Sequence, residues 1–144
     1  IHEKTILFKP NGETVCKARL DAFDPEKNFI LDVKTTSSLK DFTDSIVKYN
    51  YHAQAAFYCK AFEMRYKKTP IFYWLAVDLS SPYEFRLMTP CPATMEVGTR
   101  VYEAWLKKYV ECVKNDNWPD QYNGIEMVTL PPWILTRALG PEFN

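Results

Sequence analysis

The stretch IFYWLAV at residues 71–77 is apolar at every position, so a strand formed by it must have both of its faces covered. Pro70 precedes this stretch, and the turn-forming sequence DLSSP follows it at residues 78–82. It is far too short to span a membrane, and the chain contains no longer apolar run. We therefore expect a central strand in a sheet that helices cover, and no membrane partner.

Three further strands are predicted before this one. Residues 3–9 form the first, and Asn-Gly at residues 11–12 favours a hairpin turn after it. Residues 14–23 alternate between polar and apolar side chains, which indicates a second strand. A second turn leads into the third strand at residues 29–35, so that residues 3–36 make an antiparallel meander.

Two helices and one more strand complete the pattern. A long helix is expected over about residues 41–67, with its apolar positions in a narrow stripe made of Ile46, Ala53, Phe57 and Met64. Residues 83–88 form a hairpin partner for the central strand. Pro92 begins a second helix over about residues 92–114.

This order, β-β-β-α-β-β-α, predicts an α/β fold with a mixed central sheet flanked by helices. We expect a single domain at residues 1–144, with a core over about residues 1–115 and a C-terminal extension at residues 116–144. The extension has no clear element. Its apolar residues Trp133, Ile134 and Leu135 are expected to cap the core or to bind a neighbouring subunit.

Charge and cysteine content exclude some classes of site. The 18 Lys and Arg residues equal the 18 Asp and Glu residues, so any nucleic-acid binding must depend on a local patch. Four cysteines, at positions 16, 59, 91 and 112, match no spacing of a metal site or an iron–sulfur cluster. We expect reduced thiols, a cytoplasmic location and no iron–sulfur cluster.

Two carboxylates on neighbouring predicted strands form the first candidate site. Asp21 ends the second strand and Asp32 lies in the third, so strand pairing can bring them together. Two close carboxylates repel each other, and a divalent cation such as Mg²⁺ removes that conflict. Lys34 shares the face of Asp32 and can act on a water molecule or a phosphate beside the metal. On these residues alone, an ordinary ion pair at a strand edge explains Asp32 and Lys34 better than a nuclease site does.

The long helix adds two polar residues. Gln54 and Tyr58 are four positions apart and therefore point the same way. They are expected at the rim where the helix meets the sheet, where Gln54 can donate to a phosphate and Tyr58 can stack or hydrogen-bond. Taken singly, Gln54 is better explained as a helix-surface amide and Tyr58 as half-buried packing.

Together these residues resemble the PD-(D/E)xK nuclease superfamily. The resemblance is carried by CKARLDAF, ILDVKTT and YHAQAAFY, which contain Asp21, then Asp32-Val33-Lys34, then Gln54 and Tyr58. Within the superfamily, the chain is similar to the exodeoxyribonuclease VIII branch, related to lambda exonuclease. The similarity covers about residues 1–62, and the rest of the chain agrees only in element order.

The resemblance implies a restriction-endonuclease-like core with the order αβββαβ, whose first helix is expected upstream of Ile1. It implies Mg²⁺-dependent cleavage of DNA, with Mn²⁺ as a substitute, by 5′ to 3′ digestion of linear duplex ends. A bacterial or phage recombination or repair role follows, with a single-strand annealing or recombinase protein as a partner and a ring-like homo-oligomer as the assembly.

The resemblance also assigns roles to residues. Asp21, Asp32 and the Val33 carbonyl would ligate metal, Lys34 would be the catalytic lysine, and Gln54 and Tyr58 would support the site and the DNA. Glu3 or His2 could supply the metal group that the family takes from its upstream helix, although both could equally be solvated terminal residues. The residues expected to follow the DNA backbone are Lys17 and Arg19, which share the face of Asp21, together with Lys40 and Lys48.

Two alternatives stay open. The same core could serve a structure-specific or repair endonuclease, which acts on flaps or internal sites. It could also be a non-catalytic module that binds nucleic acid or protein and has kept the fold.

Overall fold

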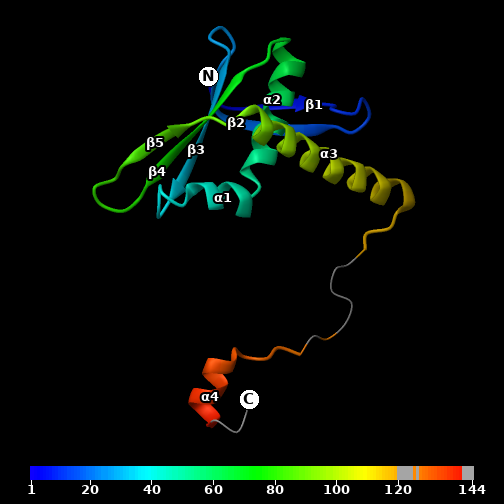
Figure 1. Cartoon of the computed structure of the whole chain (residues 1–144). Helices are drawn as coiled ribbons and strands as arrows, with labels where there is room; N and C mark the ends of the chain where they lie inside the picture. Colours follow the sequence, from blue (N-terminus) through cyan, green and yellow to red (C-terminus); the bar gives the residue numbers. More distant parts are fainter. Residues whose placement is uncertain (120–124, 126, 141–144) are drawn as a thin grey trace.

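The computed structural model describes residues 1–119, 125 and 127–140. Within these residues one five-stranded sheet has the order β1-β2-β3-β4-β5. Its strands are β1 (His2–Phe8), β2 (Cys16–Asp24), β3 (Phe29–Thr36), β4 (Ile71–Asp78) and β5 (Phe85–Met88). The helices are α1 (Phe42–Lys48), α2 (Tyr51–Tyr66), α3 (Pro92–Asn115) and α4 (Pro132–Leu139). Figure 1 shows the arrangement.

The sheet is mixed, as the sequence predicted. β1, β2 and β3 form the expected antiparallel meander, because short turns connect them. β3 and β4 run parallel, because α1 and α2 lie between them in the chain and return it to the same end of the sheet. β5 pairs antiparallel with β4, so the apolar stretch at residues 71–77 has a partner on each side.

Helix α2 occupies the centre of the fold. It contacts β1 and β2 of the sheet and also packs against α3. Its buried residues are Ala53, Ala55, Ala56, Cys59, Ala61 and Phe62. The predicted stripe does face the core, since Ala53 is buried and Ile46, Phe57 and Met64 pack against the core. The covered surface is wider than predicted because α2 lies between the sheet and α3, so small residues are needed around most of its circumference.

The single helix predicted over residues 41–67 is two helices. Tyr49 ends α1, and Asn50 adopts a left-handed conformation with a φ of 55° before α2 begins. Asn tolerates this conformation better than most residues, so the chain changes direction here without Gly or Pro. The break places Tyr51 at the start of α2, beside β3.

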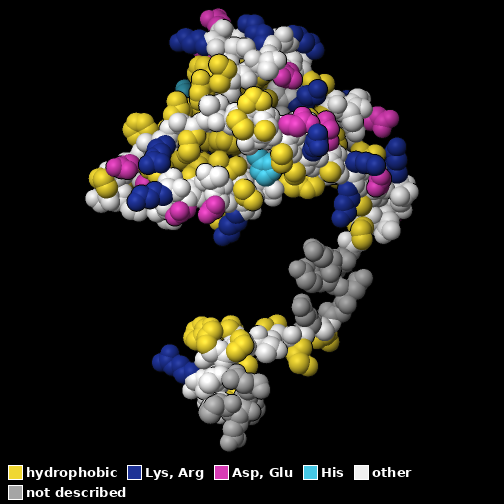
Figure 2. Space-filling view, viewed as in Figure 1, with side chains coloured by type: hydrophobic (Ala, Val, Ile, Leu, Met, Phe, Trp, Pro, Cys, Tyr) yellow, Lys and Arg dark blue, Asp and Glu magenta, His cyan; other side chains and the backbone are white. Residues whose placement is uncertain are grey.

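The C-terminal extension contains a helix that the sequence did not predict. Pro132 lies in the first turn of α4, and none of the side chains in this helix is buried. Figures 1 and 2 show α4 apart from the sheet, with hydrophobic side chains on its surface. The expectation that Trp133, Ile134 and Leu135 cap the core is therefore wrong for α4. Residues 120–124, 126 and 141–144 of the extension lie outside the described residues.

No helix in the described part of the chain combines the length and the hydropathy that a membrane span requires. On the face shown in Figure 2, acidic and basic side chains are interspersed, in keeping with the balanced charge of the chain.

Candidate active site

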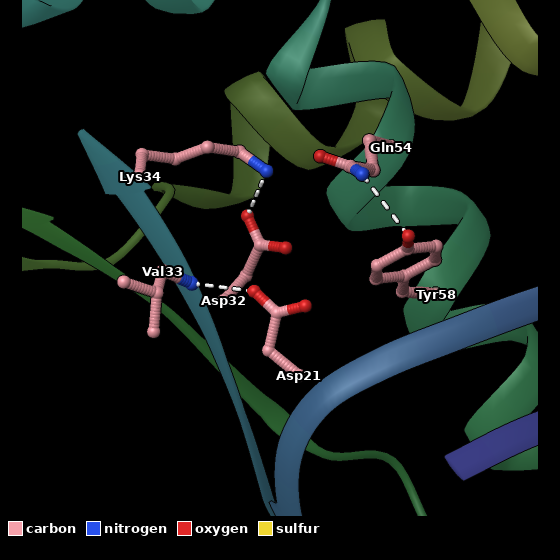
Figure 3. A network of polar contacts seen from close by, with 6 residues as sticks. All are labelled: Asp21, Asp32, Val33, Lys34, Gln54 and Tyr58. Atoms are coloured by element: carbon pink, nitrogen blue, oxygen red, sulfur yellow. Dashed lines mark hydrogen bonds and ion pairs between the residues drawn. The ribbon is translucent and has the colours of Figure 1, made fainter. Parts of the chain in front are cut away.

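The two strand carboxylates meet where β2 and β3 separate. Pairing between these strands runs from Asp24 and Phe29 to Ala22 and Leu31, and it ends one residue before Asp21 and Asp32. Beyond that point, the backbone N–H of Val33 donates a 2.8 Å hydrogen bond to Oδ2 of Asp21 instead of to a strand partner. The register therefore brings Asp21 and Asp32 together, as the sequence predicted (Figure 3).

A change in strand phase turns Asp21 toward Asp32. Ala18 and Leu20 are buried on β2, but the next buried residue is Phe23, so the two-residue alternation shifts between Leu20 and Phe23. Opposite this shift, Glu3 of β1 has a φ of 46°, which is unusual inside a strand. Asp21 consequently lies on the same face as Phe23 and not on that of Arg19.

This phase change overturns the prediction that Lys17 and Arg19 share the face of Asp21. Both are exposed, and Arg19 forms a 2.7 Å ion pair with Glu3 away from the two carboxylates. Strict two-residue alternation, as assumed from the sequence, assigns the residues after such a phase change to the wrong face.

Asp32 is the only charged residue among the buried side chains of the described chain, with 1% of its surface exposed. Lys34 is largely covered too, and its Nζ lies 2.6 Å from Oδ2 of Asp32. The same ammonium lies over the ring of Tyr51, 4.7 Å from its centroid. Lys34 is thus held between a carboxylate and an aromatic face, and its position is fixed from two sides.

The electrostatics of Asp32 favour a cation. Burial raises the pKa of its carboxyl, while the Lys34 ammonium lowers it and the neighbouring Asp21 raises it further. Oδ2 of Asp32 is buried, and its partner is the Lys34 ammonium. Two carboxylates with one lysine leave a net negative charge, so these residues fit a divalent cation.

Gln54 and Tyr58 face the carboxylates from α2, as Figure 3 shows. Nε2 of Gln54 donates a 3.0 Å hydrogen bond to the Tyr58 hydroxyl, whereas Oε1 of Gln54 is buried without a partner. Burial raises the pKa of Tyr58; the bond from Gln54 lowers it, and the charges of Asp32 and Asp21 raise it. The structure therefore brings Asp21, Asp32, Lys34, Gln54 and Tyr58 into one network.

Other predicted residues lie outside this network. Glu3 is exposed and paired with Arg19, and no group of three His, Cys, Asp or Glu residues suited to a metal ion occurs in the described part of the chain. Glu3 and His2 therefore do not complete a ligand set with Asp21 and Asp32, because β1 directs them elsewhere. Lys40 is exposed, and Lys48 lies over the ring of Tyr49, 5.3 Å from its centroid.

Tyr51 belongs to the site and was not predicted. It lies three positions before Gln54 and seven before Tyr58, so all three share one helical face. That spacing could have placed Tyr51 beside Lys34, on the face of Gln54 and Tyr58. The helix break at Asn50, which makes Tyr51 the first residue of α2, was not predicted.

Comparison of the sequence with families of known proteins gives one match. Residues 2–131 match the model of a family described as a PDDEXK-like domain of unknown function (DUF3799). No curated protein matches the chain in sequence.

Comparison of the fold with solved structures gives a similar result. The chain is similar to a crystal structure of a protein from Eubacterium rectale that is described as a candidate exonuclease, with a TM-score of 0.74 and 13% sequence identity. The match covers 97% of this chain and 57% of that one, so the chain spans a little over half the length of its structural neighbour. At this identity the likeness shows the fold alone.

Proposed function

The chain belongs to the family of PDDEXK-like domains of unknown function, and from this premise we propose that it hydrolyses phosphodiester bonds in DNA with the help of a divalent cation. Family membership confirms the predicted superfamily and its α/β core. Assignment to the exodeoxyribonuclease VIII branch stays a prediction. The observation that carries the proposal is the joint position of Asp21, Asp32 and Lys34 at the open end of the β2–β3 pair.

Asp21 and Asp32 would hold the cation, with the Val33 carbonyl as a further ligand. Mg²⁺ is the expected ion and Mn²⁺ a substitute, because hard cations prefer carboxylate and carbonyl oxygens. When bound, such an ion supplies positive charge to a phosphate oxygen and favours ionisation of a water molecule.

The side chains of this chain perform the remaining tasks. Lys34 is positioned by Asp32 and Tyr51, so its ammonium can donate to a phosphate oxygen as negative charge develops there. Gln54 has a free acceptor and a donor already engaged by Tyr58, so it can orient a water molecule or a nucleotide. Burial of Asp32 excludes bulk water and strengthens these interactions.

The proposed substrate is linear DNA degraded from its ends in the 5′ to 3′ direction. Support comes from the resemblance of the Asp21 to Tyr58 pattern to exonucleases, and from the description of the structural neighbour as a candidate exonuclease. An annealing or recombinase partner and a ring-like assembly are further proposals that rest on the same resemblance.

Cleavage assays test this proposal. With linear duplex DNA and Mg²⁺, Asp32→Asn and Lys34→Ala are each expected to lower the rate by at least about 10²-fold. The first removes the charge of a carboxylate that would hold the cation, and the second removes the ammonium that would donate to the phosphate. Lys108→Ala, which removes an exposed lysine of α3, is the matched control and should keep the full rate. Undiminished cleavage by both site variants would show that the activity lies elsewhere.

Two further measurements separate the alternatives. Covalently closed circular DNA should stay intact if the enzyme depends on ends, whereas an endonuclease would cut it. Calorimetric titration with Mg²⁺ or Mn²⁺ should show binding that Asp21→Asn and Asp32→Asn abolish. A non-catalytic module would show neither cleavage nor carboxylate-dependent metal binding.

A further inference from the structure

An aromatic groove begins at the candidate site and extends between α2 and α3. It has a volume of about 650 Å³, and Lys34 and Gln54 lie in its lining. Its aromatic residues are Tyr49, Tyr51, Phe57, Tyr102, Trp105 and Tyr109. Because two residues of the site also line the groove, whatever fills it lies next to the carboxylates.

Three of these rings are about half exposed, although Tyr49 also contacts Lys48 and Tyr51, and Tyr109 also contacts Trp118. Tyr49, Trp105 and Tyr109 are 55%, 52% and 48% exposed. Trp105 and Tyr109 are four positions apart on α3 and therefore present their rings on one face of the helix. Tyr102, which lines the same groove, is buried, whereas these three rings keep exposed surface that a flat ligand can contact.

A polar group points to the same kind of ligand. Gln54 lines the aromatic groove. Its Oε1 is buried and accepts no hydrogen bond. The Asn50 side chain, at the helix break, also lines the groove. An exposed aromatic wall with a few amide groups suits a nucleobase, which offers two π faces and an edge of donors and acceptors.

A second hollow of about 410 Å³ adjoins the groove and differs in chemistry. It shares Tyr49 and Tyr51 with the groove, and its other lining includes the hydroxyl residues Thr35, Thr36, Ser37, Ser45 and Ser80. The rings of Tyr49 and Tyr51, with centroids 5.5 Å apart, form the wall between the two. Hydroxyl groups donate readily to phosphate oxygens, so the two hollows match the two halves of a nucleotide strand.

We infer that the aromatic groove binds unpaired nucleobases of the strand whose phosphate reaches Asp32 and Lys34. The inference rests on the proposed function for the position of the phosphate, and it adds a substrate class: single-stranded DNA, or a duplex end whose last bases have separated. Bases inside a duplex are stacked on their neighbours and cannot present both faces to protein rings, so an intact blunt end fits the groove poorly.

Oligonucleotide binding tests the inference without requiring cleavage. The probe is a fluorescent single-stranded oligothymidylate, titrated with the full chain in EDTA and followed by anisotropy. Trp105→Ala is expected to weaken binding by about 5- to 150-fold, the range that corresponds to loss of one base–aromatic stack. Trp105→Phe, which keeps a ring, should restore most of the affinity, and thermal unfolding should show that both variants fold.

The control is Phe85→Ala, which removes a more exposed ring from β5, outside the groove. It should bind the oligonucleotide as the unsubstituted chain does, and a blunt duplex of the same length should bind more weakly than the single strand. Absence of binding by the unsubstituted chain, equal binding by Trp105→Ala, or equal affinity for the blunt duplex each overturns the inference. So does displacement of the oligonucleotide by a synthetic peptide of residues 127–140 in a Trp105-dependent way, which would assign the groove to α4.

Failure of this test is distinct from failure of the proposed function. A chain that cleaves DNA with Asp32-dependent activity but binds oligothymidylate independently of Trp105 keeps the first proposal and loses the second. A chain that binds the oligonucleotide through Trp105 but shows no cleavage keeps the groove and loses the catalytic role.

Discussion

Asp32 carries an unfavourable energy in the metal-free fold. Its carboxylate is buried, and a buried charge is costly unless it is fully paired. Lys34 offsets part of this cost, but Asp21 adds a second negative charge. A residue that served only to stabilise the fold would not be placed in this way. The arrangement is explained by a ligand that brings positive charge.

This cost predicts a pH dependence of stability. Since burial raises the pKa of Asp32 above 3.8, the folded chain retains this proton at a pH where the unfolded chain has lost it. The free energy of unfolding therefore falls as pH rises through that interval. Asp32→Asn cannot ionise, so in EDTA its stability relative to the unsubstituted chain should be higher at about pH 7 than at about pH 3.5. Urea denaturation at the two pH values measures this.

The Asp24 carboxyl provides a control, because its effect on stability is expected to change with pH in the opposite direction. Hydrogen bonds from the backbone N–H groups of Lys27 and Glu26 lower the pKa of this carboxyl, which belongs to the last residue of β2. Its contribution to stability is present above the unfolded pKa and is lost as pH falls. Asp24→Asn should therefore be relatively less stable at about pH 7 than at about pH 3.5. The same sign for both variants would contradict the account of Asp32.

At the scale of elements, the contact between α2 and α3 determines the shape of the groove. Gly98 of α3 lies directly against the backbone of His52 in α2. A Cβ at Gly98 would lie 2.7 Å from the His52 carbonyl carbon and closer still to its oxygen. Because backbone atoms cannot move aside as a flexible side chain can, a larger residue must push the two helices apart.

Gly98→Ala is therefore expected to destabilise the chain by about 1–3 kcal/mol. The usual effect of this change inside a helix is a gain of about 1 kcal/mol, so the sign itself is diagnostic. Urea denaturation measures the change, and Val97→Ala, at an exposed neighbouring position, is the control and should be close to neutral. A stabilised Gly98→Ala chain would show that α3 does not approach α2 as closely as the structure indicates.

The elements that sequence patterns predicted well are those with local signals. Turn residues around Gly12 and Pro25 defined the meander, and neighbouring strands of a meander pair, which is why the approach of Asp21 to Asp32 could be predicted. The break at Asn50 carries no Gly or Pro and was missed. The phase change in β2 was also missed, because it depends on the conformation of Glu3 in another strand.

The candidate site also contains features that local sequence patterns predicted and features that they did not. Asp32, Lys34, Gln54 and Tyr58 lie within single elements, so periodicity alone placed them correctly relative to their neighbours. The groove could not be predicted, because it needs the packing of α3 on α2, and a contact such as that of Gly98 with His52 leaves no periodic signal in the sequence. Long-range packing, unlike a turn or a strand pair, has no local sequence code.

At the scale of the whole molecule, the core ends with a contact between α3 and the segment after it. The ring of Trp118 packs edge-on against Tyr109, with centroids 5.8 Å apart. Beyond this contact, α4 buries none of its side chains. Stability of the sheet and of α2 should therefore depend on residues up to Trp118 and not on α4.

Two truncated chains test this division. A chain ending at residue 119 should match the full chain in urea-unfolding midpoint and in its rate of DNA cleavage, because it loses no buried contact of α4. A chain ending at residue 116 also loses the Tyr109–Trp118 pair and should be less stable, by at most about 1 kcal/mol because both rings are partly exposed. If the chain ending at residue 119 unfolds at a clearly lower urea concentration, α4 packs on the core in solution, and the apolar side chains of that helix belong to the fold.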